Sequence, residues 1–374
     1  MRIGIDIKCL RYNNSGIGRY LKSILDALQQ VDTENEYLLF SPHRINYRIT
    51  NRRFKLVPYA GRISFQKRFP GIVWQQLTLP RLLKRFKIDV FWGPEQTLPL
   101  ARVKVKTVLT IHDFVYKRFP ETMQKTVLWI NDHIGEKSID RADVIAVNSE
   151  FTRTELLHFH PDTEKGKIEV VHCGINRSGN PERIPAGEKS GLLFVGSLEP
   201  RKNLANLVRA LEILDRKGIQ IPLTLTGPKG WKNAEESSLL KNTPIAGNIR
   251  HLGFVDDTQL ESLYAHSVAV IFPSVYEGFG LPALEALVHW TPVLTTKGSA
   301  MEEIVQGCGA YFDAGSPESI ARAIEDFFGH YAGHDFLEGK EAEREAILET
   351  YQWNNSAKKL VQIFKRLDSG EGRA

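Results

Sequence analysis

The sequence predicts an α/β protein made of two doubly wound domains, each a parallel sheet with helices on both faces. Short apolar strand patterns alternate with amphipathic helix patterns along the chain, which is typical of parallel sheets. The alternation stops at 177–190, a segment rich in glycine, proline and charge, and then starts again. The 374 residues are also enough for two domains with separate cores.

The first half of the chain begins with a strand pattern, RIGIDI, that Asp6 interrupts. A carboxylate inside a strand of this kind needs a buried partner, which the sequence does not identify. The strands expected in this half are 2–7, 37–40, 54–58, 89–92, 106–111, 143–148 and 168–172. The expected helices cover 19–30, 73–86, 122–141 and a stretch that begins at Glu150.

The second half repeats the pattern after the linker. Its expected strands are 191–196, 222–227, 248–253, 268–272 and 310–312, with a further strand that ends near Thr296. Its expected helices follow Asn203 and cover 258–267, 316–328, 335–350 and 355–367. We therefore expect an N-terminal domain at 1–180 and a C-terminal domain at 191–350 that face each other across a cleft. The helix within 351–374 is expected to pack back on the N-terminal domain.

Composition is that of a globular protein in a reducing compartment. Hydrophobic residues make up 42% of the chain and charged residues 25%. The sequence contains no apolar run of about 18 residues, and MRIGIDIKCL lacks the apolar core of a signal peptide. The three cysteines have no metal-ligand spacing. These features predict a cytoplasmic protein.

Positive charge is concentrated in the first 110 residues. They contain 20 Lys and Arg against 7 Asp and Glu, although the whole chain carries a net charge of only +5. Such a half indicates an anionic partner, either a membrane surface or an acceptor that carries pyrophosphate, and a solvated basic surface is the alternative. No nucleic-acid-binding module is visible, so nucleic acid is not expected as a partner. The clustered basic residues are Arg44, Arg48, Arg52, Arg53, Lys55, Arg62, Lys67, Arg68, Arg81, Lys84, Arg85 and Lys87.

The segment 271–296, IFPSVYEGFGLPALEALVHWTPVLTT, predicts a strand, a loop, a helix and a second strand. Glu277 and Glu285 lie on either side of a glycine-rich turn. Glycine lets a loop approach a ligand closely, and Pro282 fits the first turn of a helix that begins near Leu281. That helix would offer free N–H groups and a positive dipole end to hydroxyls or anions. Two glutamates at this spacing are also common on solvated loops and helices, which is the alternative.

The sequence SGIGRY at 15–20 lies between the first expected strand and the first expected helix. It matches the dinucleotide-binding fingerprint only in part, because Leu21 stands where the third glycine would be. Its position nevertheless suits a backbone cradle for phosphate, and an ordinary strand-to-helix turn is the alternative.

His112 follows an expected strand, within the tetrapeptide TIHD. A histidine at a strand end is either a hydrogen-bonded structural residue or a group that contacts substrate. Asp113 would then orient His112 or contact an acceptor.

Arg201 and Lys202 lie between a strand and a helix, in FVGSLEPRKNL, and Asn203 is expected to cap that helix. Two cations at a helix N-terminus would neutralise the charge that develops on a departing diphosphate without a metal ion. A basic turn with no ligand is the alternative.

These segments, taken in this order, resemble the retaining GT-B glycosyltransferases of family 4, and the resemblance extends from Met1 to about Arg366. The resemblance implies that Glu285 binds the ribose of a nucleotide-sugar. Arg201 and Lys202 match its diphosphate-binding pair. The residues implied to hold the donor sugar are Glu277, Phe279, Gly280 and Leu281.

The other matched segments imply further contacts. HLGFV resembles the segment that meets the nucleobase, through Val255, and Gly16 in SGIGRY would approach the donor diphosphate and the acceptor. His112 matches a family histidine close to the reacting sugar. NSEFT at 148–152 resembles a family turn that is a candidate structural feature. The groups expected to act in catalysis are His112, Glu277, Arg201 and Lys202.

The resemblance is strongest to bacterial mannosyltransferases that build O-antigen or exopolysaccharide, as in WQQLTLPRLL at 74–83. It implies transfer of mannose from GDP-mannose to a lipid-linked or polysaccharide acceptor at the inner face of the membrane. The sequence lacks D-x-D, G-x-x-x-x-G-K-[ST], G-x-S-x-G and H-E-x-x-H motifs, so neither a metal nor a cofactor is expected. The alternatives are a UDP-hexose-dependent transferase, a hydrolase that uses the glutamate pair, and a non-catalytic nucleotide-sugar-binding subunit.

Overall fold

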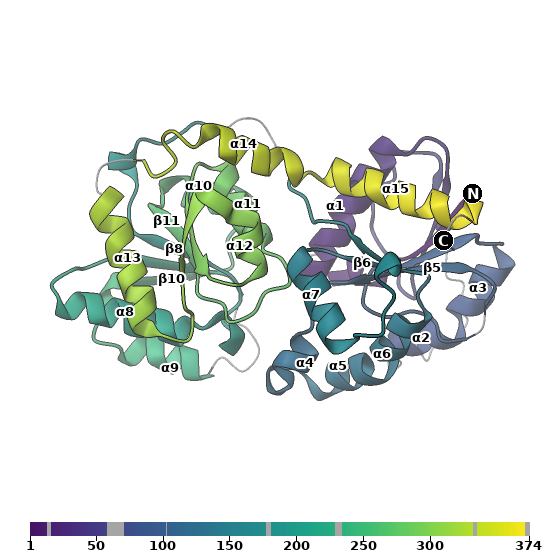
Figure 1. The fold of residues 1–374 in the computed structure, drawn as a ribbon, viewed down its shortest axis with the longest axis horizontal. Coiled ribbons are helices and arrows are strands. Elements are labelled where there is room, and N and C mark those ends of the chain that lie inside the picture. The colour runs from purple at the N-terminus through teal and green to yellow at the C-terminus, as the bar shows by residue number, and fades with distance from the viewer. Residues whose placement is uncertain are drawn as a thin grey trace. The chain divides into compact units, whose positions relative to one another are not determined.

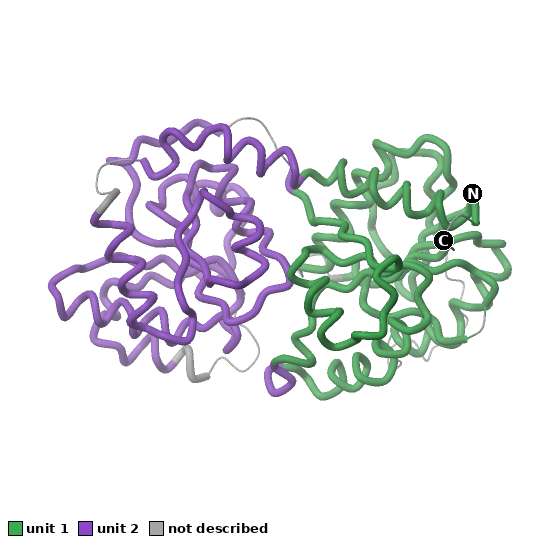
Figure 2. The backbone as a smooth tube through the Cα atoms, in the orientation of Figure 1, with its two compact units in different colours: residues 1–118, 123–174, 352–374 green, residues 119–122, 175–351 purple. Residues whose placement is uncertain are grey.

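The computed structural model describes residues 1–12, 16–57, 71–101, 103–176, 181–228, 234–331 and 335–370. The chain forms two compact units, which Figure 2 shows in different colours. Unit 1 contains Met1–Arg118, Met123–Gly174 and Gln352–Ala374. Unit 2 contains Phe119–Thr122 and Ile175–Tyr351.

Unit 1 is built on a parallel sheet of seven strands in the described part of the chain, in the order β3-β2-β1-β4-β5-β6-β7. Its central strands are almost wholly buried, so they read as apolar runs and not as alternating patterns. The strands are β1 (Arg2–Asp6), β2 (Glu36–Phe40), β3 (Phe54–Val57), β4 (Val90–Gly93), β5 (Lys106–Ile111), β6 (Val144–Val147) and β7 (Ile168–Val170).

The helices of unit 1 connect these strands and cover the sheet (Figure 1). They are α1 (Gly16–Val31), α2 (Gly71–Leu77), α3 (Leu79–Arg85), α4 (Val115–Arg118), α5 (Lys125–Ile130), α6 (Glu136–Arg141), α7 (Glu150–Phe159) and α15 (Trp353–Ser369). The single helix expected at 73–86 is instead two helices, because Pro80 cannot donate a backbone hydrogen bond inside a helix. The helix expected at 122–141 is interrupted by a π-helical turn at Asn131–Gly135.

The last helix, α15, packs on the core of unit 1. The ring of its Trp353 meets Tyr20 of α1 at a centroid distance of 5.6 Å, and Phe364 lies 6.2 Å from Trp92 of β4. The chain enters this helix close to Gly174, where an added Cβ atom would lie 2.2 Å from the Trp353 nitrogen. Glycine is therefore required at 174 by the close approach of the two backbones.

Unit 2 has a parallel sheet of six strands among the described residues, in the order β10-β9-β8-β11-β12-β13. Helices α8 and α13 pack against each other, and α11 contacts α10, α12 and α14 (Figure 1). The strands are β8 (Leu192–Val195), β9 (Leu223–Thr226), β10 (Ile249–Gly253), β11 (Ala269–Phe272), β12 (Val293–Thr296) and β13 (Gly309–Phe312). The helices are α8 (Leu204–Arg216), α9 (Ala234–Asn242), α10 (Asp257–His266), α11 (Leu281–Val288), α12 (Ala300–Val305), α13 (Pro317–Tyr331) and α14 (Glu341–Thr350).

Two features of unit 2 differ from the sequence-based expectation. The helix expected from residue 335 begins only at Glu341, because Asp335 accepts a hydrogen bond from the Leu337 nitrogen in a turn and Gly339 has a φ of +78°. Helices α9 and α12 were not expected. Helix α9 has only weak amphipathic character. Helix α12 is too short for its apolar residues to show a helical period.

The predicted fold class is confirmed, because each unit is a parallel sheet with helices on both faces. In each sheet the strand order reverses next to the first strand of the unit, between β1 and β4 and between β8 and β11. Ligands of such sheets bind beyond the carboxyl ends of the strands, near this point. Among the residues that the structure describes, no helix is long and apolar enough to cross a membrane.

Candidate functional site

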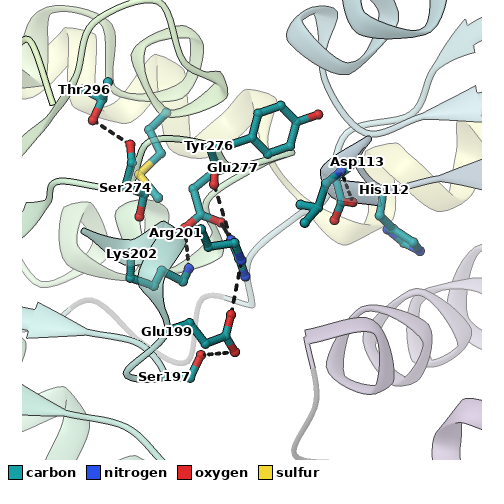
Figure 3. Close-up of polar contacts among 12 residues, drawn as sticks. His112, Asp113, Ser197, Glu199, Arg201, Lys202, Ser274, Tyr276, Glu277 and Thr296 are labelled. Atoms are coloured by element: carbon teal, nitrogen blue, oxygen red, sulfur yellow. Dashed lines mark hydrogen bonds and ion pairs between the residues drawn. The ribbon is translucent and has the colours of Figure 1, made fainter. Parts of the chain in front are cut away.

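The candidate site in unit 2 is centred on an ion-paired cluster at the carboxyl edge of the sheet (Figure 3). Glu277 follows β11, and its two carboxylate oxygens bind different cations. One accepts a hydrogen bond from the Arg201 guanidinium at 3.0 Å, and the other accepts one from the Lys202 ammonium. The three residues predicted as catalytic in this half are thus in direct contact, although 75 positions of sequence separate Lys202 from Glu277.

The charge state of Glu277 follows from these contacts. Burial by itself would raise the pKa of the Glu277 carboxyl, but Lys202 and Arg201 outweigh it and lower that pKa to about 2. Burial also lowers the pKa of the Lys202 ammonium, and the charge of Glu277 opposes this. The carboxylate is therefore ionised at neutral pH, and it holds the two cations in place.

The turn that carries Arg201 and Lys202 is stabilised by the carboxylate of Glu199, which belongs to the same turn. Ser197 donates a hydrogen bond to Glu199 at 2.7 Å, and Glu199 accepts a second from the Arg201 guanidinium at 3.2 Å. The Arg201 carbonyl accepts a hydrogen bond from the Val275 nitrogen at 3.0 Å, which ties the turn after β8 to the loop after β11. Lys202 and Glu277 are brought together by this link between two strand ends.

The expected cap by Asn203 is wrong. This residue has a left-handed backbone, with a φ of 58°, and its side chain makes no capping hydrogen bond to α8. The amide instead donates to the carbonyl oxygens of Pro273 at 2.9 Å and Ala314 at 2.7 Å. Asn203 therefore joins three strand ends, and asparagine is one of the few residues that adopt this backbone readily.

The glycine-rich loop leads into α11, which begins at Leu281 as expected. Gly280 precedes it with a φ of +152°, and a Cβ atom there would lie 2.7 Å from Met301. The Phe279 side chain is buried, with its ring 5.8 Å from that of Tyr351. A ligand at this loop would therefore meet the backbone of Phe279, while the ring anchors the loop to the core.

Glu285 lies one turn into α11, and its carboxylate accepts a hydrogen bond from the Tyr264 hydroxyl at 2.8 Å. Tyr264 is buried in α10, and its ring stacks on His289 at 5.8 Å. Sequence reasoning missed Tyr264, because a tyrosine on an apolar helix face reads as core. The buried hydroxyl of Tyr264 requires a polar partner, and this requirement is the signal by which Tyr264 could be found from the sequence.

Three glycines, Gly196, Gly227 and Gly253, stand at the carboxyl ends of the adjacent strands β8, β9 and β10. The Gly196 nitrogen donates a hydrogen bond to the Thr226 carbonyl oxygen at 2.9 Å, and the Gly227 nitrogen donates one to the Gly253 carbonyl oxygen at 2.8 Å. A Cβ atom at Gly227 would lie 2.1 Å from the Gly196 oxygen, so no larger residue fits there. Val255, predicted to meet the nucleobase, is half-buried two residues beyond Gly253.

Two of the predicted site residues belong to unit 1. Gly16 is exposed at the first position of α1, and Ser15 of the same motif lies outside the described residues. His112 follows β5 at the carboxyl edge of the sheet and is 8% exposed. Its Nε2 atom lies 2.8 Å from the Pro94 carbonyl oxygen, and its ring meets Tyr20 edge-on at 4.8 Å. Burial lowers the pKa of the His112 imidazole.

The residues that follow β5 and β6 complete this edge. Asp113 accepts a hydrogen bond from the Val115 nitrogen at 3.1 Å, at the start of α4. The Asn148 amide donates to the His112 carbonyl at 2.9 Å, and Ser149 caps α7 by accepting from the Thr152 nitrogen at 3.0 Å. The NSEFT segment therefore has a structural function, since it caps a helix and supports the backbone at His112.

The partner of Asp6 is also visible. Asp6 is buried and pairs with the Lys8 ammonium at 2.8 Å, and the same ammonium pairs with Glu95 at 2.5 Å. Gln75 donates a further hydrogen bond to Asp6 at 3.0 Å. Sequence reasoning did not connect these residues, because they come from three separate segments. In the described residues, no group of three or more His, Cys, Asp or Glu side chains is arranged to hold a metal ion.

Comparison with known proteins identifies this architecture. The model "Glycosyltransferase Family 4" matches residues 14–178, and the model "Glycosyl transferases group 1" matches residues 180–331. The fold resembles that of sucrose-phosphate synthase from Thermosynechococcus elongatus, with a TM-score of 0.75 at 18% identity over 99% of this chain and 100% of that one. It also resembles Anabaena HepE, solved with UDP and glucose, with a TM-score of 0.69 at 15% identity over 98% and 99% of the two chains. The protein belongs to the GT-B glycosyltransferases of family 4.

Among curated sequences, two similar relatives are O-antigen chain mannosyltransferases. O-antigen chain mannosyltransferase B of Escherichia coli is 28% identical over 98% of this chain and 100% of its own. O-antigen chain mannosyltransferase RfbU of Salmonella typhimurium is 22% identical over 86% of this chain and 90% of its own. The chain thus aligns with these enzymes along nearly its whole length.

Proposed function

We propose that this protein is a retaining mannosyltransferase that transfers mannose from GDP-mannose to a lipid-linked or polysaccharide acceptor during cell-surface glycan synthesis. The observation that carries the proposal is the cluster of Glu277, Arg201 and Lys202 at the carboxyl edge of the unit 2 sheet. Two cations preorganised by one carboxylate suit a diphosphate leaving group. The full-length likeness to O-antigen chain mannosyltransferases supports mannose as the sugar.

The donor would be recognised by unit 2. Arg201 and Lys202 would bind the diphosphate, and Glu277 would accept hydrogen bonds from sugar hydroxyls, together with the backbone N–H groups that follow it. Glu285 would bind the ribose hydroxyls, with Tyr264 holding its carboxylate at 2.8 Å. The backbone near Val255 would contact the base.

The reaction would proceed on one face of the sugar. The bond from the anomeric carbon to the diphosphate oxygen breaks, and a bond from the acceptor hydroxyl oxygen forms on the same face. The acceptor proton passes to an oxygen of the leaving diphosphate, while Arg201 and Lys202 stabilise the charge that remains. Neither a protein nucleophile nor a metal ion is needed in this scheme.

The first experiment is donor hydrolysis and transfer across a panel of nucleotide sugars, with and without EDTA. We expect GDP-mannose to be used fastest and EDTA to leave the rate unchanged. If a UDP-hexose is used faster than GDP-mannose, the proposed donor is wrong and the protein is a UDP-hexose-dependent transferase. If one donor binds tightly but none is turned over, the protein is a non-catalytic binding subunit. The anomeric configuration of the product, measured by NMR, tests retention.

We further propose that the acceptor reaches the protein at a membrane surface, through the basic residues of unit 1. Arg44, Arg48 and Arg52 are exposed, whereas Lys55 pairs with Glu36. Arg62, Lys67 and Arg68 lie outside the described residues. Flotation with anionic vesicles should show binding at low salt that is lost at high salt, because exposed charges are screened. Association that is absent, or that salt does not change, would contradict this.

A further inference from the structure

The C-terminal end of α11 is bound by a buried arginine from α14. The Arg344 side chain is 2% exposed, and its Nε atom donates a hydrogen bond to the Leu287 carbonyl oxygen at 2.6 Å. Its Nη2 atom donates one to the Val288 carbonyl oxygen at 2.8 Å. The last carbonyl groups of a helix lack partners within it, and the helix dipole is negative at this end. One guanidinium therefore satisfies two of these groups and complements the dipole.

The same guanidinium packs on the ring of Trp290, just after α11. The Arg344 Cζ atom lies 3.7 Å from the ring centroid, and the Arg183 Cζ atom lies 4.8 Å from it. Trp290 has a left-handed backbone, with a φ of 57°, which a bulky residue adopts only when its surroundings require it. Its carbonyl oxygen accepts a hydrogen bond from the Lys189 ammonium at 2.6 Å. Trp290 is therefore held both by its ring and by its backbone.

Arg183 is itself anchored by two carboxylates. It pairs with Asp335 at 2.6 Å and with Glu341, the first residue of α14, at 3.1 Å. The segment 183–189, the start of α14 and the end of α11 are thus joined at the Trp290 ring.

Helix α14 also reaches the loop at the other end of α11. The ring of Tyr351, the residue after α14, lies 5.8 Å from the ring of Phe279 in the glycine-rich loop. The two helices pack against each other (Figure 1). Helix α11 has eight residues, about two turns, and Gly280 before it has no side chain to cap the first turn. The placement of so short a helix depends on the groups that bind its ends.

The burial of Arg344 suits positioning better than stabilisation. A guanidinium loses its hydration in the interior, and apolar residues of similar volume are often as stable there or more stable. The carboxylate of Glu345 is 3.9 Å from the Arg344 guanidinium and is partly exposed, so the short bonds of Arg344 are those to α11. They fix the end of a helix on which Glu285 lies only two residues before Leu287. The direction of the Glu285 side chain therefore depends on them.

We propose that α14 is a positioning element of the donor site, in which Arg344 holds the C-terminal end of α11 so that Glu285 faces the ribose hydroxyls of the nucleotide. Arg344 is a positioning residue, which acts through Glu285, and Trp290 keeps its guanidinium in place. The inference rests on the proposed function. It extends the donor site to a helix beyond residue 331, where the match to the family model ends.

Nucleotide binding tests the inference without turnover. GDP, 2′-deoxy-GDP and 3′-deoxy-GDP are titrated by calorimetry into the wild-type protein and into Arg344→Lys. Lysine keeps the charge but lacks the planar fork that bonds two carbonyls and stacks on a ring. We expect loss of a ribose hydroxyl to weaken binding about 10-fold in the wild type and less than about 3-fold in the variant, because a displaced Glu285 no longer accepts its hydrogen bond. An unchanged ratio overturns the inference.

The outcomes for the wild type and for the variant have different meanings. If the wild type binds GDP and both deoxy analogues equally, Glu285 does not bind the ribose, and its proposed function and this inference both fail. If the wild type discriminates and Arg344→Lys discriminates as strongly, only the inference fails. UDP and its deoxy analogues take the place of GDP if UDP binds more tightly, so a wrong donor base does not affect the test.

Steady-state kinetics distinguish positioning from a loss of folded protein. We expect Arg344→Lys to raise the donor KM about 3- to 10-fold with a nearly unchanged kcat, because a ribose contact contributes equally to the ground state and the transition state. A partly folded variant would instead show a lower kcat at an unchanged KM, and this result contradicts the inference. Arg141→Lys is the matched control, since Arg141 at the end of α6 also donates to a backbone carbonyl, that of Leu100, at 2.5 Å. It should leave the donor KM unchanged.

A double variant tests whether Arg344 acts through Glu285. Glu285→Gln alone should raise the donor KM, and adding Arg344→Lys to it should raise the KM by less than about 2-fold more, because coupled residues are not additive. If the two effects multiply, Arg344 influences donor binding by another route and the inference is wrong.

Trp290→Leu approaches the same point from outside α14, and it decides the question if Arg344→Lys does not fold. Trp290 is half-buried, and the change removes the ring on which the guanidinium packs while both carbonyl bonds of Arg344 can still form. We expect discrimination between GDP and its deoxy analogues to fall about 2- to 5-fold. Full wild-type discrimination in this variant overturns the inference.

Discussion

The carboxyl edges of the two sheets use charge in opposite ways. In unit 2, Glu277 lies between Arg201 and Lys202, so the charged groups themselves form the candidate site. In unit 1, Lys8 pairs with Asp6 and Glu95, and the buried imidazole of His112, whose pKa is lowered by burial, lies against the Pro94 carbonyl oxygen. Two parallel sheets with similar strand orders thus carry a cluster of paired charges at one carboxyl edge and a buried imidazole at the other.

This difference has a physical reason. A diphosphate carries charge that must be neutralised where it leaves, and cations held by a carboxylate need little reorganisation to do this. A neutral imidazole, by contrast, offers hydrogen bonds without a charge. The contrast leads to the following expectations, which we order from the largest effect to the smallest.

Replacing Lys202 with alanine should have the largest effect. We expect transfer to fall on the order of 100- to 1000-fold, because a preorganised cation at the leaving group is lost. Steady-state kinetics measure the rate, and the melting temperature checks the fold. Lys217→Ala is the control, since Lys217 lies just after α8 and pairs at 2.5 Å with Glu325. Near-normal turnover in Lys202→Ala would exclude an anion site at this edge.

Glu277→Gln should reduce kcat less, by on the order of 10- to 100-fold, because the sugar contacts that we propose for the backbone N–H groups of the loop would remain. The same change frees both cations from their carboxylate. We therefore expect the nucleoside diphosphate product to bind more tightly than it does to the wild-type protein, as calorimetry can measure. Weaker product binding would mean that Arg201 and Lys202 do not face the diphosphate.

The pH dependence of the protein's stability tests whether Glu277 is ion-paired in the folded state. The pKa of Glu277 is about 2 in the folded protein, below the ordinary glutamate value of 4.5 that we expect when the chain is unfolded. The folded value is lower, so the stabilisation is complete above pH 4.5 and is lost as the pH falls toward 2. The melting temperature of Glu277→Gln should therefore lie well below that of the wild type at pH 7 and approach it at pH 3. A difference that does not change with pH would contradict the ion-paired state.

Tyr264→Phe should have the smallest effect. The change removes one hydrogen bond to Glu285 and leaves the stacked ring in place. We expect the donor KM to rise about 3- to 10-fold with a nearly unchanged kcat, because the ribose contact that we propose for Glu285 would be the same in the ground state and in the transition state. A change in kcat without a change in KM would show that Glu285 acts at the reacting carbon.

Much of the fold could be predicted from local pattern. The strands were found because buried parallel strands are short apolar runs, and α11 was placed at Leu281 because Pro282 follows a glycine turn. Prediction from local pattern failed where a side chain makes its hydrogen bonds to residues far away in the sequence. Asn203 was expected to cap α8, and instead it donates to Pro273 and Ala314. Competition between a nearby and a distant acceptor cannot be read from the residues next to it.

The sequence by itself determined the alternation of strands and helices, the position of the linker, and the residues that stand at the strand ends. It also carried the family resemblance, because the motifs occur in order along the chain. Only the tertiary structure decided which charges meet, since Glu277 and Lys202 become neighbours through the pairing of β8 with β11. It likewise decided the hydrogen-bond partner of His112, because the Pro94 carbonyl reaches that ring only once β4 lies beside β5. The reason is that ion pairs and side-chain hydrogen bonds depend on distances between segments, which no local pattern specifies.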